Sequence, residues 1–303
     1  MRVFIAGASG AIGRPLIEQL VARGHEVVGM TRSNAELVAS LGAEPVVADA
    51  LDAAGLHAAV TGAKPEVVVN QLTDLGQPLN PRKYGEWLAG TNRLRRECTW
   101  SLARAAEEAG ATKFISQGVA FAYRFDPGMK TEDSPLIGPA AGEMGEAIDE
   151  LERTTLAAPG GIVLRYGFFY GPGTFYAEDG QQTEMIRKRQ MPIVGSGGGR
   201  FPFIHVEDAA AATVAAIEHG EPGVYNVVDD EPAPAREWIP YVADLVGAKK
   251  PWRIPAFVAK LAAGQIAGFA TQLQPVSNAK AKQALGWEPH YASWREGFRA
   301  ELD

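Results

Sequence analysis

The sequence contains one cysteine, Cys98, among its 303 residues. A single thiol cannot form a disulfide within the chain, which excludes a disulfide-stapled domain and favours a reducing compartment. We interpret Cys98 as a small, buried side chain of a helix.

Basic residues are outnumbered by acidic ones, 29 to 36, and long apolar runs are scarce. The formal net charge is −7, whereas nucleic acids and anionic membranes require clustered basic residues. The most apolar helical stretch, residues 256–271, is interrupted by Lys260 and Gln265 and is too short to span a bilayer. No signal-type segment precedes the first strand. We therefore expect a cytoplasmic protein that binds neither nucleic acid nor membrane.

The N-terminal segment combines a strand with a glycine-rich turn. Residues 3–6 are apolar, and residues 14–23 have a helical pattern. Between them, Gly7 permits a tight turn, Gly10 lets a pyrophosphate approach the backbone, and Gly13 lets the helix pack closely on the sheet. The phosphates would lie at the N-terminus of this helix. The turn therefore predicts a dinucleotide site with the following candidate contacts: Gly7, Ser9, Gly10, Ala11, Ile12 and Gly13.

The second predicted strand, residues 26–30, indicates which dinucleotide is bound. An NAD site usually places a carboxylate after this strand, where it binds the ribose 2′-hydroxyl. Here the strand is followed by Arg32 and Ser33. The planar guanidinium of Arg32 can pair with a 2′-phosphate, and Ser33 can donate a further hydrogen bond. We therefore predict NADP(H) as the cofactor, with NAD(H) as the alternative.

Further strands are predicted at residues 45–48, 66–70, 113–116 and 162–166, and a long helix over residues 91–109. Alternation of strands and helices is typical of a parallel sheet covered on both faces. We predict an α/β fold with a Rossmann-type, doubly wound parallel sheet. Ligands of such sheets bind beyond the carboxyl ends of the strands, where we find these further candidates: Asp49, Ala50, Gln71, Leu72 and Ser116. Asp49 could instead cap the helix expected over residues 53–60.

Four later segments, together with the Gly-x-x-Gly-x-x-Gly spacing, resemble the short-chain dehydrogenase/reductase superfamily. They are Leu-Arg-Tyr-Gly-Phe-Phe-Tyr-Gly-Pro-Gly at 164–173, Phe-Ile-His-Val-Glu-Asp-Ala-Ala at 203–210, Gly-Val-Tyr-Asn-Val at 223–227, and residues 277–289 with Leu-Gly-Trp-Glu-Pro. Together they are similar to its extended or atypical branch, the NAD(P)-dependent epimerase/dehydratase-like proteins. In that family the Asp49 position contacts adenine, and the segment with Tyr166, Gly167 and Phe168 passes beside the nicotinamide.

The resemblance also implies two domains. Residues 1–166 and 203–229 would form the NADP-binding domain, and residues 167–202 and 230–303 a smaller, mainly helical, C-terminal substrate domain. We expect its core to contain Trp238, Trp252, Trp287, Trp294 and the helix beginning at Ala256.

The catalytic residues that this family implies are absent from the sequence. Its members use a Ser or Thr after the fifth strand and a Tyr-x-x-x-Lys pair on the next helix, and the corresponding positions hold Gly118, Met144 and Ile148. No tyrosine in the chain is followed by a lysine four residues later. We predict Tyr176 and Tyr123 as replacement proton donors, because both segments run past the nicotinamide, with the Gln117 amide orienting a carbonyl.

Three functions are compatible with these features. We predict an atypical NADP-dependent oxidoreductase, or a related isomerase or lyase, that acts on a small, partly apolar carbonyl or alcohol; a homodimer is compatible with this. The alternatives are a non-catalytic NADP(H) sensor and a nucleotide-sugar epimerase or dehydratase. The last is disfavoured because Phe168 occupies the place of an asparagine that contacts the nucleotide diphosphate in those members. We predict no metal site, and interpret the acidic run Asp229-Asp230-Glu231 as a solvated loop.

Overall fold

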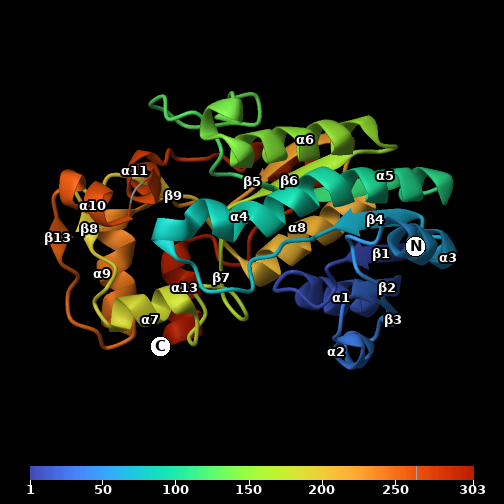
Figure 1. The fold of residues 1–303 in the computed structure, drawn as a ribbon. Coiled ribbons are helices and arrows are strands. Elements are labelled where there is room, and N and C mark those ends of the chain that lie inside the picture. The colour runs from blue at the N-terminus through green and yellow to red at the C-terminus, as the bar shows by residue number, and fades with distance from the viewer. Residues whose placement is uncertain (264) are drawn as a thin grey trace.

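A computed structural model describes residues 1–263 and 265–303, and its largest element is a parallel sheet of seven strands. The strand order is β3-β2-β1-β4-β5-β6-β11, so the order reverses between β1 and β4. The strands are β1 (Arg2–Ala6), β2 (Glu26–Thr31), β3 (Glu44–Val47), β4 (Val67–Asn70), β5 (Lys113–Val119), β6 (Ile162–Tyr166) and β11 (Gly223–Val227). The predicted α/β doubly wound sheet is confirmed (Figure 1).

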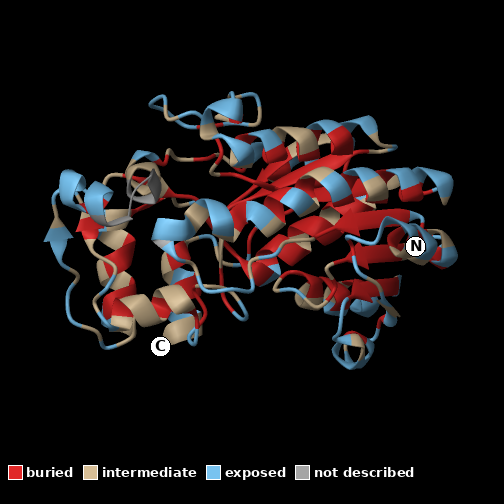
Figure 2. Cartoon of the chain, viewed as in Figure 1, coloured by how far each residue is buried: buried red, intermediate tan, exposed pale blue. Residues whose placement is uncertain are grey.

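Helices cover both faces of this sheet. Along β1, Val3 and Ile5 point to one face, and Phe4 and Ala6 to the other, each joining a different apolar cluster. The first face carries α1 (Gly13–Ala22), α8 (Val206–His219) and α12 (Ala279–Leu285); the second carries α3 (Ala53–Ala63), α5 (Thr99–Glu108) and α6 (Glu143–Ala157). The short α2 (Ala35–Ser40) lies against β3. Figure 2 shows the strands buried between helices whose outer faces are exposed.

The helical segment before β5 is longer than predicted. It begins at Tyr84, after the short helix η1 (Pro81–Lys83), and consists of α4 (Tyr84–Arg93), a π-helical turn η2 (Leu94–Cys98) and α5. The Asn70 amide, at the end of β4, donates a hydrogen bond of 3.0 Å to the Thr99 hydroxyl. This contact fixes the π-helical turn beside the carboxyl edge of the sheet, while α4 extends beyond that edge.

The remaining elements form a smaller body, here called the cap. It contains the strand pairs β7 (Phe168–Tyr170) with β10 (Phe203–His205), β9 (Arg200–Phe201) with β12 (Ala233–Pro234), and β8 (Ile193–Val194) with β13 (Arg253–Ile254). Its helices are α7 (Gln181–Arg187), α9 (Ala235–Leu245), α10 (Ala256–Ala263), α11 (Gln265–Gln272) and α13 (Trp294–Leu302), and a short helix η3 (Gly138–Ala141) precedes α6. The exact domain division stays a prediction.

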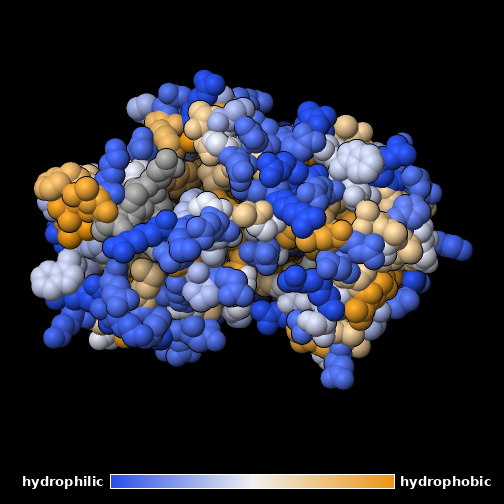
Figure 3. All heavy atoms as spheres, viewed as in Figure 1, coloured by the Kyte–Doolittle hydropathy of each residue, from blue (hydrophilic) through white to orange (hydrophobic). Residues whose placement is uncertain are grey.

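The predicted core of the cap is partly wrong. Trp238 and Trp294 are fully buried in it, but Trp287 packs in the apolar cluster of α1 and α8, because it follows α12, which lies against α8 and β11. Trp252 is 57% exposed, with the Arg189 guanidinium 3.6 Å from its ring centre. Helix α10 exposes Phe257 and Leu261. Figure 3 shows an apolar surface at the end of the cap where α10 lies in Figure 1. No helix in the described ranges is long and apolar enough to span a membrane.

Candidate functional site

The glycine turn has the geometry that a bound pyrophosphate requires. Gly7 has φ of +92°, and a Cβ there would lie 2.8 Å from the Gln71 carbonyl oxygen. A Cβ on Gly13, the first residue of α1, would lie 2.4 Å from the Gly7 oxygen. A Cβ on Gly10 would lie 3.2 Å from the same oxygen, a milder crowding. Ser9 shares a hydrogen bond of 3.0 Å with Thr31, which ties the turn to the end of β2.

Beyond β2 and β3 the surface is hollowed at the place predicted for the adenosine. An open hollow of about 530 Å³ is lined by Arg32, Val46, Val47, Ala48, Asp49, Asp52, Gly55 and Ala59. Arg32 and Ser33 are both exposed, so they are accessible to a 2′-phosphate. The alternative that Asp49 caps the next helix is wrong, because Asp52 caps α3 by accepting from the Ala54 amide at 3.2 Å. Asp49 accepts from the Leu51 amide and lines the hollow.

The side chains of three other predicted cofactor contacts are buried in, or packed against, the core of the protein. Ala50 is buried, and its carbonyl accepts a hydrogen bond from the Cys98 thiol at 3.0 Å. Ser116 is fully buried and accepts from Thr155 at 2.8 Å. Leu72 packs against the cluster of α3 and α5. Only backbone atoms of Ala50 and Ser116 could therefore reach a cofactor from these positions.

Gln71, which follows β4, is hydrogen-bonded to Tyr166 at the end of β6, near the place where the strand order of the sheet reverses. The Gln71 amide donates to the Tyr166 hydroxyl at 3.3 Å, and that hydroxyl shares a bond of 2.6 Å with Thr213. Burial raises the pKa of Tyr166 to about 12. The Gln71 Oε1 atom is buried and has no partner in the described part of the chain. A cofactor amide or hydroxyl could satisfy this orphaned acceptor.

Phe168 belongs to a wall of aromatic rings at the carboxyl ends of β5 and β6. Its ring stacks on Phe121 at 4.3 Å between centres, and Phe269 of α11 meets Phe121 at 6.3 Å and Phe125 at 5.7 Å. All four side chains are partly exposed. Gly167, just before Phe168, has no room for a Cβ, which would lie 2.3 Å from the Pro202 oxygen. We call Phe121, Phe125, Phe168 and Phe269 the aromatic wall.

The two predicted proton donors are both buried. Tyr123 donates to Asn226 at 2.6 Å and accepts from Arg165 at 2.8 Å, and burial raises its pKa. Tyr176 lies in the cap core among Phe203, Trp238 and Phe298, and burial raises its pKa strongly. These surroundings weaken the prediction that either residue delivers a proton. Gln117 lies half-buried on β5, and no described residue bonds its side-chain amide.

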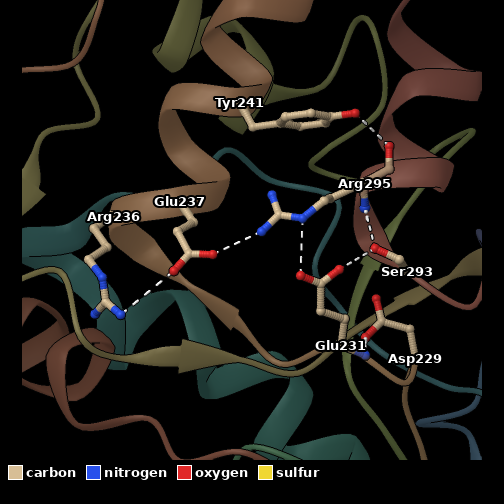
Figure 4. A network of polar contacts seen from close by, with 7 residues as sticks. All are labelled: Asp229, Glu231, Arg236, Glu237, Tyr241, Ser293 and Arg295. Atoms are coloured by element: carbon tan, nitrogen blue, oxygen red, sulfur yellow. Dashed lines mark hydrogen bonds and ion pairs between the residues drawn. The ribbon is translucent and has the colours of Figure 1, made fainter.

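The acidic run at 229–231 is only partly solvated, because Asp229 is buried and the carboxylates of Asp230 and Glu231 are paired; Figure 4 shows the pairing of Glu231 with Arg295. Glu231 pairs with Arg295 at 3.0 Å and accepts from Ser293, while Arg295 also pairs with Glu237 at 2.8 Å. Asp230 accepts from Asn278 at 2.7 Å and pairs with Lys282 at 3.1 Å. Asp229 is buried, and burial raises its pKa well above the usual range.

Sequence reasoning missed Tyr84 and Arg95, which come from α4 and η2. The Tyr84 hydroxyl contacts the Met144 sulfur of α6 at 3.8 Å. Arg95 is 8% exposed, although no described residue pairs with it or accepts a hydrogen bond from it. The available signal was an arginine in line with Leu88 and Asn92 on the inward face of a helix.

The chain belongs to the NAD dependent epimerase/dehydratase family, whose model matches residues 3–228. This confirms the resemblance drawn from its motifs. A relative from Streptomyces sp., named 3-diazoavenalumate denitrifying reductase, is 42% identical and covers 99% of this chain and 100% of its own length. A 2-alkyl-3-oxoalkanoate reductase from Stenotrophomonas maltophilia is 23% identical, covering 82% and 77%.

Solved structures show the same fold over the whole chain. A human epimerase family protein with NADPH superposes with a TM-score of 0.77 at 22% identity, covering 100% of this chain and 99% of its own. The dTDP-glucose 4,6-dehydratase of Streptomyces venezuelae, with NAD bound, gives 0.80 at 18% identity, covering 100% and 96%. The family thus binds NAD or NADP, in agreement with the glycine turn.

Proposed function

We propose that this protein is an NADPH-dependent reductase that transfers hydride to a small aromatic substrate, and that the substrate is an aromatic acid carrying a diazo group. The aromatic wall carries the proposal. Phe121 and Phe168 follow directly on β5 and β6, at the sheet edge where ligands of this fold bind, and all four rings of the wall remain partly exposed. Stacked, accessible rings favour a flat aromatic substrate over a sugar.

The identity of the relative supports the diazo group. A protein named as a denitrifying reductase of a diazo compound matches this chain from end to end at 42% identity. When hydride replaces dinitrogen on an arenediazonium carbon, a C–H bond forms with the hydride electrons, and the C–N bond electrons leave with N₂. No oxyanion needs a proton in this reaction. It therefore fits a chain in which no tyrosine is followed by a lysine four residues later.

The proposed cofactor preference rests on Arg32. It is exposed, lines the hollow beyond β2 and β3, and stands where an NAD site has a carboxylate, directly after β2 in the sequence. A guanidinium in this place favours a 2′-phosphate over a ribose hydroxyl.

Reduction of a carbonyl is the second candidate, because the half-buried Gln117 amide is free of described partners and could orient a carbonyl oxygen. This reaction requires a proton donor, for which Tyr123 and Tyr176 stay predictions.

The test is single-turnover reduction with NADPH deuterated at the transferable position. One substrate is a benzoic acid that carries a diazonium group, and the other is a benzoic acid that carries a ketone in the same ring position. Heat-denatured protein is the control for uncatalysed reaction. We expect deuterium on the ring carbon that carried the diazo group and release of N₂. Turnover of the ketone alone would favour carbonyl reduction, and tight NADPH binding without oxidation by either substrate would favour the sensor.

A further inference from the structure

The buried guanidinium of Arg95 lacks the partner that such a group requires. Its side chain is 8% exposed, and in residues 1–263 and 265–303 it has neither a carboxylate partner nor a hydrogen-bond acceptor. Burial lowers its pKa to about 10, so it remains a cation at neutral pH. Burying an unpaired charge is costly, and natural proteins pair such groups. The guanidinium could therefore take as its partner an anion that the described residues do not supply.

Arg95 is carried by a segment at the sheet edge where the proposed substrate would bind, so the carboxylate of that substrate could be the anion. The π-helical turn that carries it directly precedes Thr99, which is bound to Asn70 at the carboxyl end of β4. π-helical turns occur frequently at functional sites. The segment before it reaches the cap, since the Trp87 ring lies 5.8 Å from that of Phe175. The helix thus bridges the sheet edge and the cap.

Tyr84 supplies a second donor in the same place. Burial raises the pKa of Tyr84, and the nearby Arg95 cation opposes this rise, so the two groups lie within electrostatic range of each other. Among the described residues, the Tyr84 hydroxyl has a hydrogen bond to the Met144 sulfur alone, at 3.8 Å, and a thioether is a weak acceptor. That hydroxyl can therefore turn to a stronger acceptor at little cost. Met144 and Phe121 both pack on the cluster of Val119, Ala122 and Ile148, so this cluster links Tyr84, through Met144, to one ring of the aromatic wall.

We propose that Arg95 and Tyr84 bind the carboxylate of the substrate, whose aromatic ring lies against the aromatic wall. This inference rests on the proposed function and assigns the residues that would bind the acid group of its aromatic substrate. The guanidinium fork offers two parallel N–H donors that match a carboxylate, and the phenol adds a third.

The test measures equilibrium binding in the presence of NADP⁺, so it does not depend on turnover. The probes are cinnamate and its uncharged isostere cinnamamide. Wild type should bind cinnamate more tightly. Arg95→Met should weaken cinnamate binding about ten- to a hundred-fold and leave cinnamamide unchanged, because hydrogen bonds to charged groups contribute about 1.5–3 kcal/mol. Tyr84→Phe should weaken cinnamate binding a few-fold.

Two controls separate binding from structure. Arg93→Met makes the same change on the outer face of α4, where Arg93 forms an exposed ion pair with Glu97, and should alter the binding of neither probe. Arg95→Met should also raise the melting temperature, because it removes an unpaired buried charge; a structural arginine would lower it.

Equal binding of both probes by wild type, or binding of neither, would overturn the inference, as would equal losses of NADP⁺ and cinnamate affinity in Arg95→Met. If Arg95→Met does not fold, the inference is still tested by comparing cinnamate with cinnamamide binding in wild type and in Tyr84→Phe. Acid-specific binding that depends on Arg95, without any oxidation of NADPH, would contradict the proposed reaction and leave the carboxylate site standing.

Discussion

Arg165 donates a hydrogen bond of 2.8 Å to the Tyr123 hydroxyl and binds both carboxylate oxygens of Glu152 at 2.7 Å. The three side chains are buried. The Tyr123 hydroxyl thereby gives the buried Arg165 guanidinium an acceptor besides Glu152, and it donates in turn to Asn226 on β11. This network joins β6, α6 and β11 behind the aromatic wall.

Tyr123→Phe should lower the free energy of unfolding by about 1–3 kcal/mol, since it leaves a donor of Arg165 and an acceptor of Asn226 unsatisfied. Urea unfolding measures this. The control is Tyr225→Phe, whose partly exposed hydroxyl donates to one carbonyl and should contribute less. Equal losses of unfolding free energy in the two variants would show that the buried network contributes no extra stability. Unchanged turnover in folded Tyr123→Phe would exclude it as the proton donor.

Arg32→Asp should reverse the cofactor preference. Wild type should bind NADPH roughly ten- to a hundred-fold more tightly than NADH, because a charge-assisted pair contributes about 1.5–3 kcal/mol. The aspartate would repel the 2′-phosphate and accept from the ribose hydroxyl. Fluorescence titration measures both affinities. Arg93→Asp, the same change on α4, should leave the ratio unaltered. Equal wild-type affinities would contradict the prediction.

Gly13→Ala should abolish tight cofactor binding and destabilise the fold by about 1–3 kcal/mol, because the new Cβ would lie 2.4 Å from the Gly7 oxygen and 2.5 Å from the Ala8 oxygen. Gly62→Ala is the control: nothing lies within 4 Å of a Cβ there, and alanine in α3 should stabilise by about 0.4–1 kcal/mol. The paired result distinguishes crowding at the turn from a general effect of adding a methyl group. If Gly13→Ala bound NADPH as tightly as wild type, the predicted role of this glycine in cofactor binding would be wrong.

Asp229→Asn should stabilise the protein at neutral pH and not below about pH 4, the usual pKa of an unfolded aspartate. Burial raises the folded pKa of Asp229, so above that pH the native state retains a proton that the unfolded chain has released. The stability of wild type therefore falls as the pH rises toward the folded pKa, and the variant removes this fall. Chemical unfolding across pH measures the difference, with surface-paired Asp230→Asn as control. A gain independent of pH would contradict the assigned protonation.

The features that sequence predicted correctly are local or repetitive. Gly7 and Gly13 are recognisable because the turn between strand and helix requires them, and the parallel strands because apolar runs alternate with helices. Which way a side chain points after a strand depends on packing by distant residues. Tyr123 and Tyr176 were selected by their place in the chain, yet both side chains turn into cores. The contact of Tyr84 with Met144 joins residues 60 apart, and no local pattern reveals it.

The sheet is completed late in the chain, and this bears on how the protein folds during synthesis. Its last strand, β11, pairs with β6 only once residues 223–227 exist, and Trp287 fills the cluster beneath α1 and α8 later still. Until then a nascent chain has an open edge on β6 and an unfilled apolar face, which are the features that promote aggregation. Long-range parallel pairing of this kind is also slow. Completion of the sheet therefore requires the chain up to residue 227, and filling of this apolar face requires Trp287 as well.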